Sequence, residues 1–95
     1  RINLALQTLS EATSLIDSDP GRALQGFRNA IAANPREPRS YAWAVVVLYR
    51  MGRFQDCRDV LNKAERSGIG RGQMMANAQF RSIMNTESFN HKIPD

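Results

Sequence analysis

The sequence predicts an all-α domain built from antiparallel pairs of helices, and three observations support this fold class. A pattern of small, large and small residues recurs after 34 positions. Apolar residues elsewhere recur at helical spacing between capping residues, and no segment shows a strand or hairpin pattern. A fixed period of this length is typical of stacked helix-pair repeats. The recurring positions are Ala23, Phe27 and Ala30, matched by Cys57, Leu61 and Ala64.

Capping and helix-ending residues mark the bounds of the first helix pair. Residues 2–17 are expected to form a helix whose apolar face carries Ile2, Leu6, Leu9, Thr13 and Ile16. Asp19 is a good N-cap, and Pro20 suits the first helical position because its missing N–H would be unpaired there anyway. The second helix should therefore run over residues 20–33. It should end before Pro35, which disfavours helical geometry in the preceding residue.

The third helix, predicted over residues 38–51, is apolar on nearly every side. Its Val45-Val46-Val47 run, taken alone, would also suit a buried strand. The apolar stretch 41–49 is too long for an ordinary strand, and the 34-residue register places a helix here. A helix that is apolar all round has to be buried between neighbours. Gly52 should then end it as a C-terminal cap.

The rest of the chain predicts a fourth and a fifth helix. Residues 54–67 should form a helix with inward-facing Phe54, Cys57, Val60, Leu61 and Ala64, followed by a flexible connection from Ser67 to Gly72. A further helix is expected over residues 73–84, with Met75, Ala78 and Ser82 facing the preceding pair. The tail, residues 85–95, holds few apolar residues and suits a frayed half-helix or an extended chain. The expected total is five helices and a partial sixth.

Length and composition indicate one small domain. Its 95 residues are 42% apolar, which is enough for a core. The chain begins at Arg1 without a starting Met, so we expect it to be part of a longer protein. The single cysteine excludes an internal disulfide and weakly favours a reducing compartment such as the cytoplasm. No apolar run approaches the ~18–20 residues of a membrane span.

The charge is positive and lies mainly in the middle of the chain. The net charge is +4, yet residues 20–81 alone hold eleven basic and four acidic side chains, and most basic residues are arginines. Arginine forks bind carboxylates and phosphates. The arginines are spread over every predicted helix and loop of this region, so a solvated surface is the simplest interpretation. Nucleic-acid binding stays open as a weaker alternative.

The sequence predicts no catalysis, metal site or cofactor. His91, in the tail, is the single histidine, and no nucleophile motif accompanies it. Cys57 lies on the expected inward face, where free cysteine usually acts as a small core residue. The glycines from Gly68 to Gly72 lack the preceding strand and the lysine-serine ending of a phosphate-binding loop.

These features resemble the tetratricopeptide repeat family, whose unit is two antiparallel helices in 34 residues. The resemblance divides the chain into units of about 3–37, 38–71 and a partial 72–95. Three positions depart from the family pattern: Tyr41 stands at its usual tryptophan, Val45 at its glycine and Ile69 at its closing proline. The matching positions are Ala23, Phe27, Ala30 and Pro35, then Gly52, Phe54, Cys57, Leu61 and Ala64.

The resemblance implies a right-handed solenoid that binds a partner protein or peptide on its concave face. An apolar anchor would be buried there and arginines would orient it, so an acidic-hydrophobic peptide is expected. The positions of the family's chaperone-binding clamp hold Ala42, Trp43 and Val46, so no such binding is expected. The expected concave-face residues are Arg39, Val46, Tyr49, Arg50, Gln73 and Phe80.

Two alternatives to an open binding groove stay possible at this point. Val46, Phe80 and Ile83 could instead pack against an additional helix or the tail. The domain could also have a structural role, because two and a half units leave both ends uncovered. It would then associate with a second copy through its end helices, or serve as an accessory domain of a larger enzyme.

Overall fold

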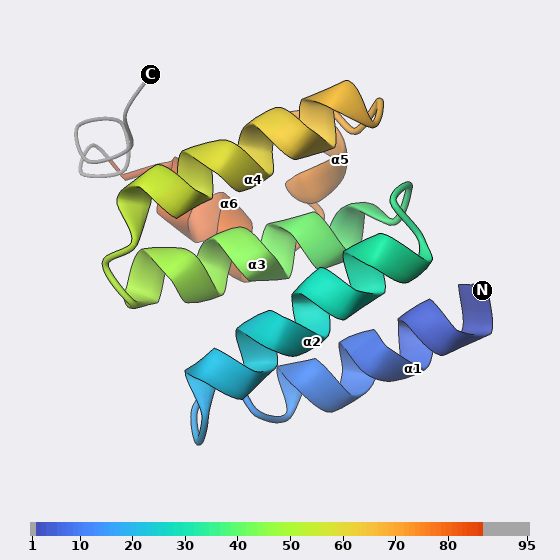
Figure 1. Ribbon diagram of the computed structural model, residues 1–95. Helices are drawn as coiled ribbons and strands as arrows, with labels where there is room; N and C mark the ends of the chain where they lie inside the picture. Colours follow the sequence, from blue (N-terminus) through green and yellow to red (C-terminus); the bar gives the residue numbers. More distant parts are fainter. Residues whose placement is uncertain (1, 87–95) are drawn as a thin grey trace.

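The computed structural model describes the backbone of residues 2–86 and the side chains of residues 7–86. Every regular element in this part of the chain is an α-helix, which confirms the predicted all-α class (Figure 1). The part of the predicted tail beyond residue 86, including His91, lies outside the described residues. The helices are α1 (Ile2–Thr13), α2 (Pro20–Ala33), α3 (Pro38–Arg50), α4 (Phe54–Arg66), α5 (Arg71–Met74) and α6 (Ala78–Met84).

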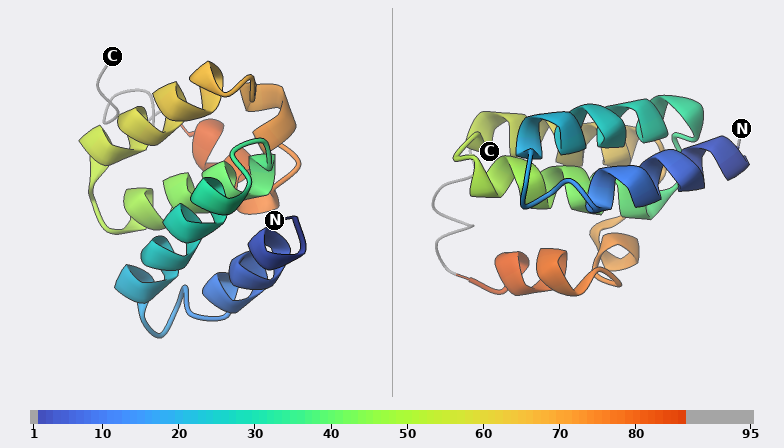
Figure 2. Two further views of the ribbon diagram at one scale, coloured as in Figure 1. Left: turned by 45° about the vertical axis from the view of Figure 1, so that its right-hand side comes forward. Right: turned by 90° about the horizontal axis from the view of Figure 1, so that it is seen from below.

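The first four helices run up and down beside one another, each antiparallel to the next (Figure 1). Seen from below, α2 and α4 form one layer and α1 and α3 form the other (Figure 2). The short α5 and α6 lie on the far side of α3, away from α2 and α4. The chain therefore turns back under α3 after α4.

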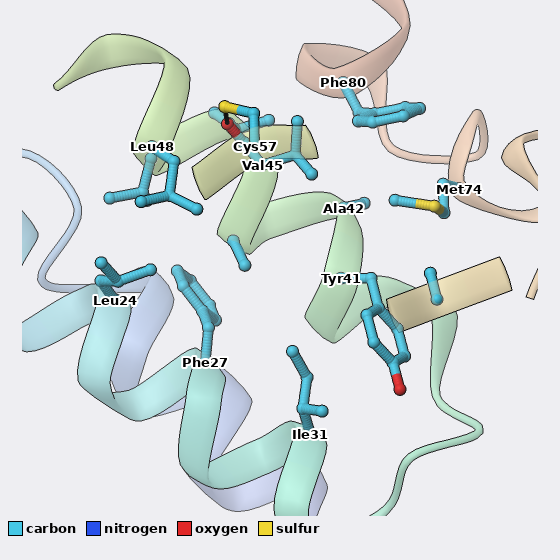
Figure 3. Packing of buried hydrophobic residues seen from close by; sticks show 14 of the residues in the cluster. Leu24, Phe27, Ile31, Tyr41, Ala42, Val45, Leu48, Cys57, Met74 and Phe80 are labelled. Atoms are coloured by element: carbon cyan, nitrogen blue, oxygen red, sulfur yellow. Dashed lines mark hydrogen bonds between the residues drawn. The ribbon is translucent and has the colours of Figure 1, made fainter. Parts of the chain in front are cut away.

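Helix α3 lies at the centre of the structure. Eight of its thirteen residues are buried, and its three consecutive valines are at most 1% exposed. It packs against α2, α4, α5 and α6. This confirms the expectation that the apolar segment is a helix enclosed on all sides (Figure 3).

The helix ends follow the predicted caps for α2 and α3, and a glycine also ends α4. The Asp19 carboxylate accepts a hydrogen bond from the Arg22 N–H at 3.3 Å, and Pro20 is the first residue of α2. Gly52 follows α3 with φ of 75°, and the Arg53 N–H donates back to the Leu48 carbonyl at 2.9 Å. Gly68 closes α4 in the same way with φ of 84°. A glycine adopts this left-handed conformation without the steric cost of a Cβ atom.

The predicted first helix is too long at its C-terminal end. Helix α1 stops at Thr13, and residues 14–18 form turns. The Thr13 and Ser14 hydroxyls donate to the Ser10 and Glu11 carbonyls at 2.8 and 2.7 Å. Such hydroxyl-to-carbonyl bonds compete with the helical pattern. Ile16 is nevertheless buried, because the turn folds it back onto the core.

The predicted fifth helix over residues 73–84 is wrong as a continuous element. It is divided into α5 and α6, because the Asn77 side chain accepts hydrogen bonds from the Gln79 and Phe80 N–H groups and caps a new helix. The break rotates the inward face, so Met74 and Phe80 are buried while Ala78 and Ser82 are exposed. Helix α6 thus comes from this break. The partial sixth helix predicted in the tail falls mostly beyond residue 86, outside the described residues.

The residues of the 34-residue pattern are all buried, at 6% exposure or less. They lie on α2 and α4, the two helices of one layer. Phe27 also stacks on Trp43 of α3, with ring centroids 6.3 Å apart and planes 9° from parallel. The recurring pattern therefore marks the two surfaces that cover α3.

Helices α1 and α2 approach most closely at Gly26. A Cβ atom added there would lie 2.7 Å from the Ala12 Cβ atom. We expect Gly26→Ala to lower the free energy of unfolding by about 1–3 kcal/mol through overpacking. Gly21→Ala, in the same helix and 3.8 Å from the nearest atom, should be neutral or stabilise by up to ~1 kcal/mol. Chemical denaturation would measure both, and equal effects would contradict this account.

Neighbouring hydroxyls on α3 should respond oppositely to deletion. The Tyr41 hydroxyl donates to the Pro35 carbonyl at 2.6 Å and lies 3.2 Å from the Ser67 hydroxyl, joining the ends of α2 and α4. The Ser40 hydroxyl is buried without a partner. Tyr41→Phe should therefore destabilise by about 1 kcal/mol, whereas Ser40→Ala should be neutral or stabilise by up to about 1 kcal/mol. The same denaturation measurement decides the sign of each change.

Candidate functional site

A groove lies where α3 meets α5 and α6, and we call it the Trp43 groove. Its volume is about 300 Å³, which is at the lower end for pockets that hold small ligands. The segment between α5 and α6 forms one wall and the first half of α3 forms the other. Its lining residues are Arg39, Trp43, Gln73, Met74, Ala76, Asn77, Ala78 and Gln79.

The floor of the groove is apolar and rigid. The Trp43 indole is half-buried, and its ring is held in place by stacking on the fully buried Phe27. Met74, 1% exposed, contributes a second apolar surface from α5. A flat indole fixed by core packing offers contact area to a ligand at little entropic cost.

The polar groups of the groove are mainly side-chain amides whose oxygens already accept hydrogen bonds. The Gln73 Oε1 atom accepts from the Gly70 N–H at 3.2 Å, and the Asn77 Oδ1 atom accepts the two bonds that cap α6. The Gln79 Oε1 atom accepts a hydrogen bond from Arg50. These bonds leave the NH₂ groups of the amides as donors, and no acidic residue lines the groove.

Arg39, an expected contact residue, lies at the groove but is paired internally. Its Nε and Nη2 atoms donate to the two Glu37 carboxylate oxygens at 3.0 and 2.8 Å. The hydrogen bonds to Arg39 lower the pKa of Glu37, and those to Glu37 raise the pKa of Arg39. Because Glu37 also caps α3 by accepting from the Arg39 N–H at 3.2 Å, the pair holds the guanidinium close to the helix end.

Tyr49 and Arg50, two other expected contacts, lie away from the Trp43 groove. Tyr49 is half-buried against Phe54, edge to face, with ring centroids 5.5 Å apart. The Arg50 side chain is exposed; it lies 3.5 Å from the Asp17 carboxylate and also donates to Gln79. Arg50 thus connects the turn after α1 with α6. Gln73, by contrast, lies in the groove as expected.

Val46 and Phe80 are not accessible, so their expected place on an open surface is wrong. Both are fully buried. The alternative of packing against another helix applies, since α6 lies on α3 and covers this face. The physical reason is that α3 is apolar on all sides and the chain itself supplies the cover.

The thiol of Cys57 belongs to the core and not to the lining of the groove. Cys57 is fully buried, as expected from its inward position, and its thiol donates to the Val45 carbonyl at 3.6 Å (Figure 3). Within residues 7–86, His, Cys, Asp and Glu side chains form no group of three or more that could hold a metal ion. Over the same part of the chain, no helix combines the length and apolarity needed to cross a membrane.

Comparison of this chain with protein-family models, with curated proteins and with solved structures gave no match. The resemblance to tetratricopeptide repeats therefore stays a sequence-based prediction.

Sequence reasoning missed several lining residues of the Trp43 groove as contact candidates, among them Trp43, Asn77 and Gln79. One feature of the sequence marks Trp43 as a candidate, since it is the only tryptophan of the chain. The apolar segment around it, however, predicts burial on all sides. Nothing in the sequence singles out Asn77 and Gln79. The predicted continuous helix over residues 73–84 lacks the break that turns them toward α3.

The buried Cys57 thiol predicts a loss of stability at alkaline pH. Burial raises its pKa to about 12, whereas an unfolded thiol titrates near pH ~8.5. The unfolded chain therefore loses this proton first, and the contribution is complete below pH ~8.5 and falls as the pH rises toward 12. The decline should approach about 1.4 kcal/mol per pH unit.

Urea denaturation between neutral and alkaline pH, with Cys57→Ala as the control, measures this contribution. Subtracting the curve of the variant removes the titration of other groups. A constant difference between the two proteins at all pH values would contradict the assignment.

Proposed function

We propose that this chain is a non-catalytic protein-interaction domain that binds an acidic-hydrophobic peptide in the Trp43 groove. The peptide would lay an apolar side chain on the Trp43 indole. An adjacent carboxylate would accept hydrogen bonds from the amide NH₂ groups and from Arg39. The observation that carries the proposal is a fixed indole ringed by donors, with no acid among the lining residues.

The chemistry of the groove favours an acceptor-rich ligand. A ligand carboxylate replaces water at donors that have no competing protein acceptor, so it loses little on leaving solvent. A basic ligand would find no carboxylate among the lining side chains. A short stretch of peptide, with one apolar and one acidic side chain, fits a volume of about 300 Å³.

The arginines do not favour the nucleic-acid alternative. They are distributed over different depressions of the described surface: Arg28 beside Asp56 and Asp59, Arg36 with Arg66, and Arg58 with Arg71. A backbone-binding protein needs its basic side chains along one track, where they neutralise successive phosphates. The resemblance to tetratricopeptide repeats points to the same class of function as the groove does.

The single tryptophan makes the proposal directly measurable. A displayed random peptide library would be selected on the 95-residue chain, and each selected peptide would then be synthesised and titrated while Trp43 emission is followed. We expect enriched sequences with an apolar residue beside Asp or Glu, and a change in Trp43 emission on binding, because the ligand covers the indole.

Gln73→Glu tests the donor argument without removing the local structure. A carboxylate at this position can still accept from the Gly70 N–H, but it lacks the NH₂ donor and repels an acid. We expect it to weaken binding about tenfold or more. Gln7→Glu, the same change on α1 outside the groove, should have no effect. The proposal is wrong if no peptide is enriched. It is also wrong if binding leaves Trp43 emission unchanged and Gln73→Glu binds as tightly as the wild type.

A further inference from the structure

We propose that the α5–α6 segment exchanges between two copies of this chain, so that each α6 packs on the α3 helix of the other copy. The occupant of the α3 face in the dimer is thus a second copy of the same segment. This inference does not rest on peptide binding by the Trp43 groove. It rests on how the segment is attached, on the turn that joins it to α4, and on what α3 requires.

The segment is attached to α3 through apolar side chains of both short helices. Met74 of α5 and Phe80 of α6 are buried, and both approach α3 on the side of Ala42 (Figure 3). Met75, Ile83 and Met84 are partly buried against the same core, whereas Gln79, Arg81 and Ser82 are exposed. A hydrogen bond from Arg50 to Gln79 accompanies this apolar contact. An identical segment from a second copy can make the same apolar contacts with α3.

Neither the segment nor the α3 face is stable alone. Ala42 and Val46 are fully buried and, four residues apart, lie on one face of α3. Without α6 this apolar face would meet water. A helix of seven residues is also too short to persist in isolation. A copy of α6 from another chain restores every one of these contacts, so exchange costs far less than simple opening.

The internal hydrogen bonds of the segment move with it. Asn77 caps α6, Gln73 accepts from the Gly70 N–H, and the Arg81 side chain donates to the Met75 carbonyl at 3.0 Å. All of these bonds lie within the segment, so they can form again on the α3 helix of either copy. The segment therefore keeps its internal hydrogen bonds in the exchanged dimer.

The turn between α4 and α5 supplies the hinge. In the closed chain Gly68 has φ of 84°, and the Ile69 N–H donates to the Ala64 carbonyl at 2.8 Å. An open linker has no need of the left-handed conformation at Gly68. A residue with a Cβ atom at this position would strain the closed chain and leave an open linker unstrained.

The first test compares Gly68→Ala with Gly70→Ala in the 95-residue chain. Each protein is refolded over a concentration series, and its mass is measured by size exclusion with light scattering. Gly68→Ala should favour the dimer roughly tenfold for each hinge, and hence roughly a hundredfold in the dimerisation constant, because a dimer relieves two hinges. Gly70 has φ of −88° and open space around its Cβ position, so Gly70→Ala should dimerise like the wild type.

A second test separates exchange from any other association. Phe80→Asp places a charge on the buried side of α6, and Ala42→Glu places a charge on the face of α3 that the segment covers. A mixed exchanged dimer contains one intact pair, the α3 of the first variant with the α6 of the second. We expect a dimer when the two are refolded together and monomers when each is refolded alone, with helical content followed by circular dichroism.

Several results would overturn the proposal. One is a wild-type chain and a Gly68→Ala variant that both stay monomeric over the whole series. A second is equal dimerisation of Gly68→Ala and Gly70→Ala. A third is a dimer formed by either Phe80→Asp or Ala42→Glu alone, since exchange could not build an intact contact there. The glycine variants keep the proposal testable even if the two charged variants fail to fold.

Discussion

The whole structure depends on enclosing α3. A helix that is apolar on every side loses free energy wherever water reaches it, so neighbours have to cover its full circumference. Helices α2 and α4 cover one side with the residues of the 34-residue pattern. The other side is covered by α5 and α6, which are short and contribute Met74 and Phe80. The turn of the chain back under α3 follows from this need.

The same requirement explains where the groove lies. The α5–α6 segment is too short to cover α3 along its whole length, so the indole of Trp43 is left half-buried at its edge. The break between α5 and α6 places the amide side chains of Asn77 and Gln79 around it. Capping α6 uses the Asn77 oxygen and leaves its NH₂ group as a donor. The polar character of the groove is thus a by-product of ending one helix and starting another.

Local signals were sufficient for much of the fold. Asp19, Pro20, Gly52 and the apolar run of α3 predicted α2 and α3, because capping and periodicity act over a few residues. The helix ends that failed are those where a polar side chain competes with the backbone, at Thr13 and at Asn77. Serine, threonine and asparagine are compatible with helix interiors too. The sequence alone therefore does not decide whether the side chain or the helical backbone makes the hydrogen bond.

The site was predicted less well, since it depends on tertiary packing. Arg39 and Gln73 do lie in the groove, whereas Val46 and Phe80 are used to bury α3. No short-range pattern reveals that a later segment will fold onto the face carrying Val46. The break at residues 75–77 decides this, since it rotates Phe80 inward where a continuous helix would have turned Ala78 and Ser82 toward the preceding pair.

The pairing of the arginines limits the positive charge that the groove presents. Arg39 is held by Glu37 at 2.8 Å, and Arg50 is shared between Asp17 and Gln79. The groove therefore presents mostly neutral donors from amides rather than free cationic charge. Neutral donors act over hydrogen-bond distances, whereas the attraction of net charge extends over a Debye length of about 8–10 Å and is screened by salt. Recognition in the groove would then depend on the geometry of the acceptor and its apolar neighbour, and only weakly on the overall charge of the partner.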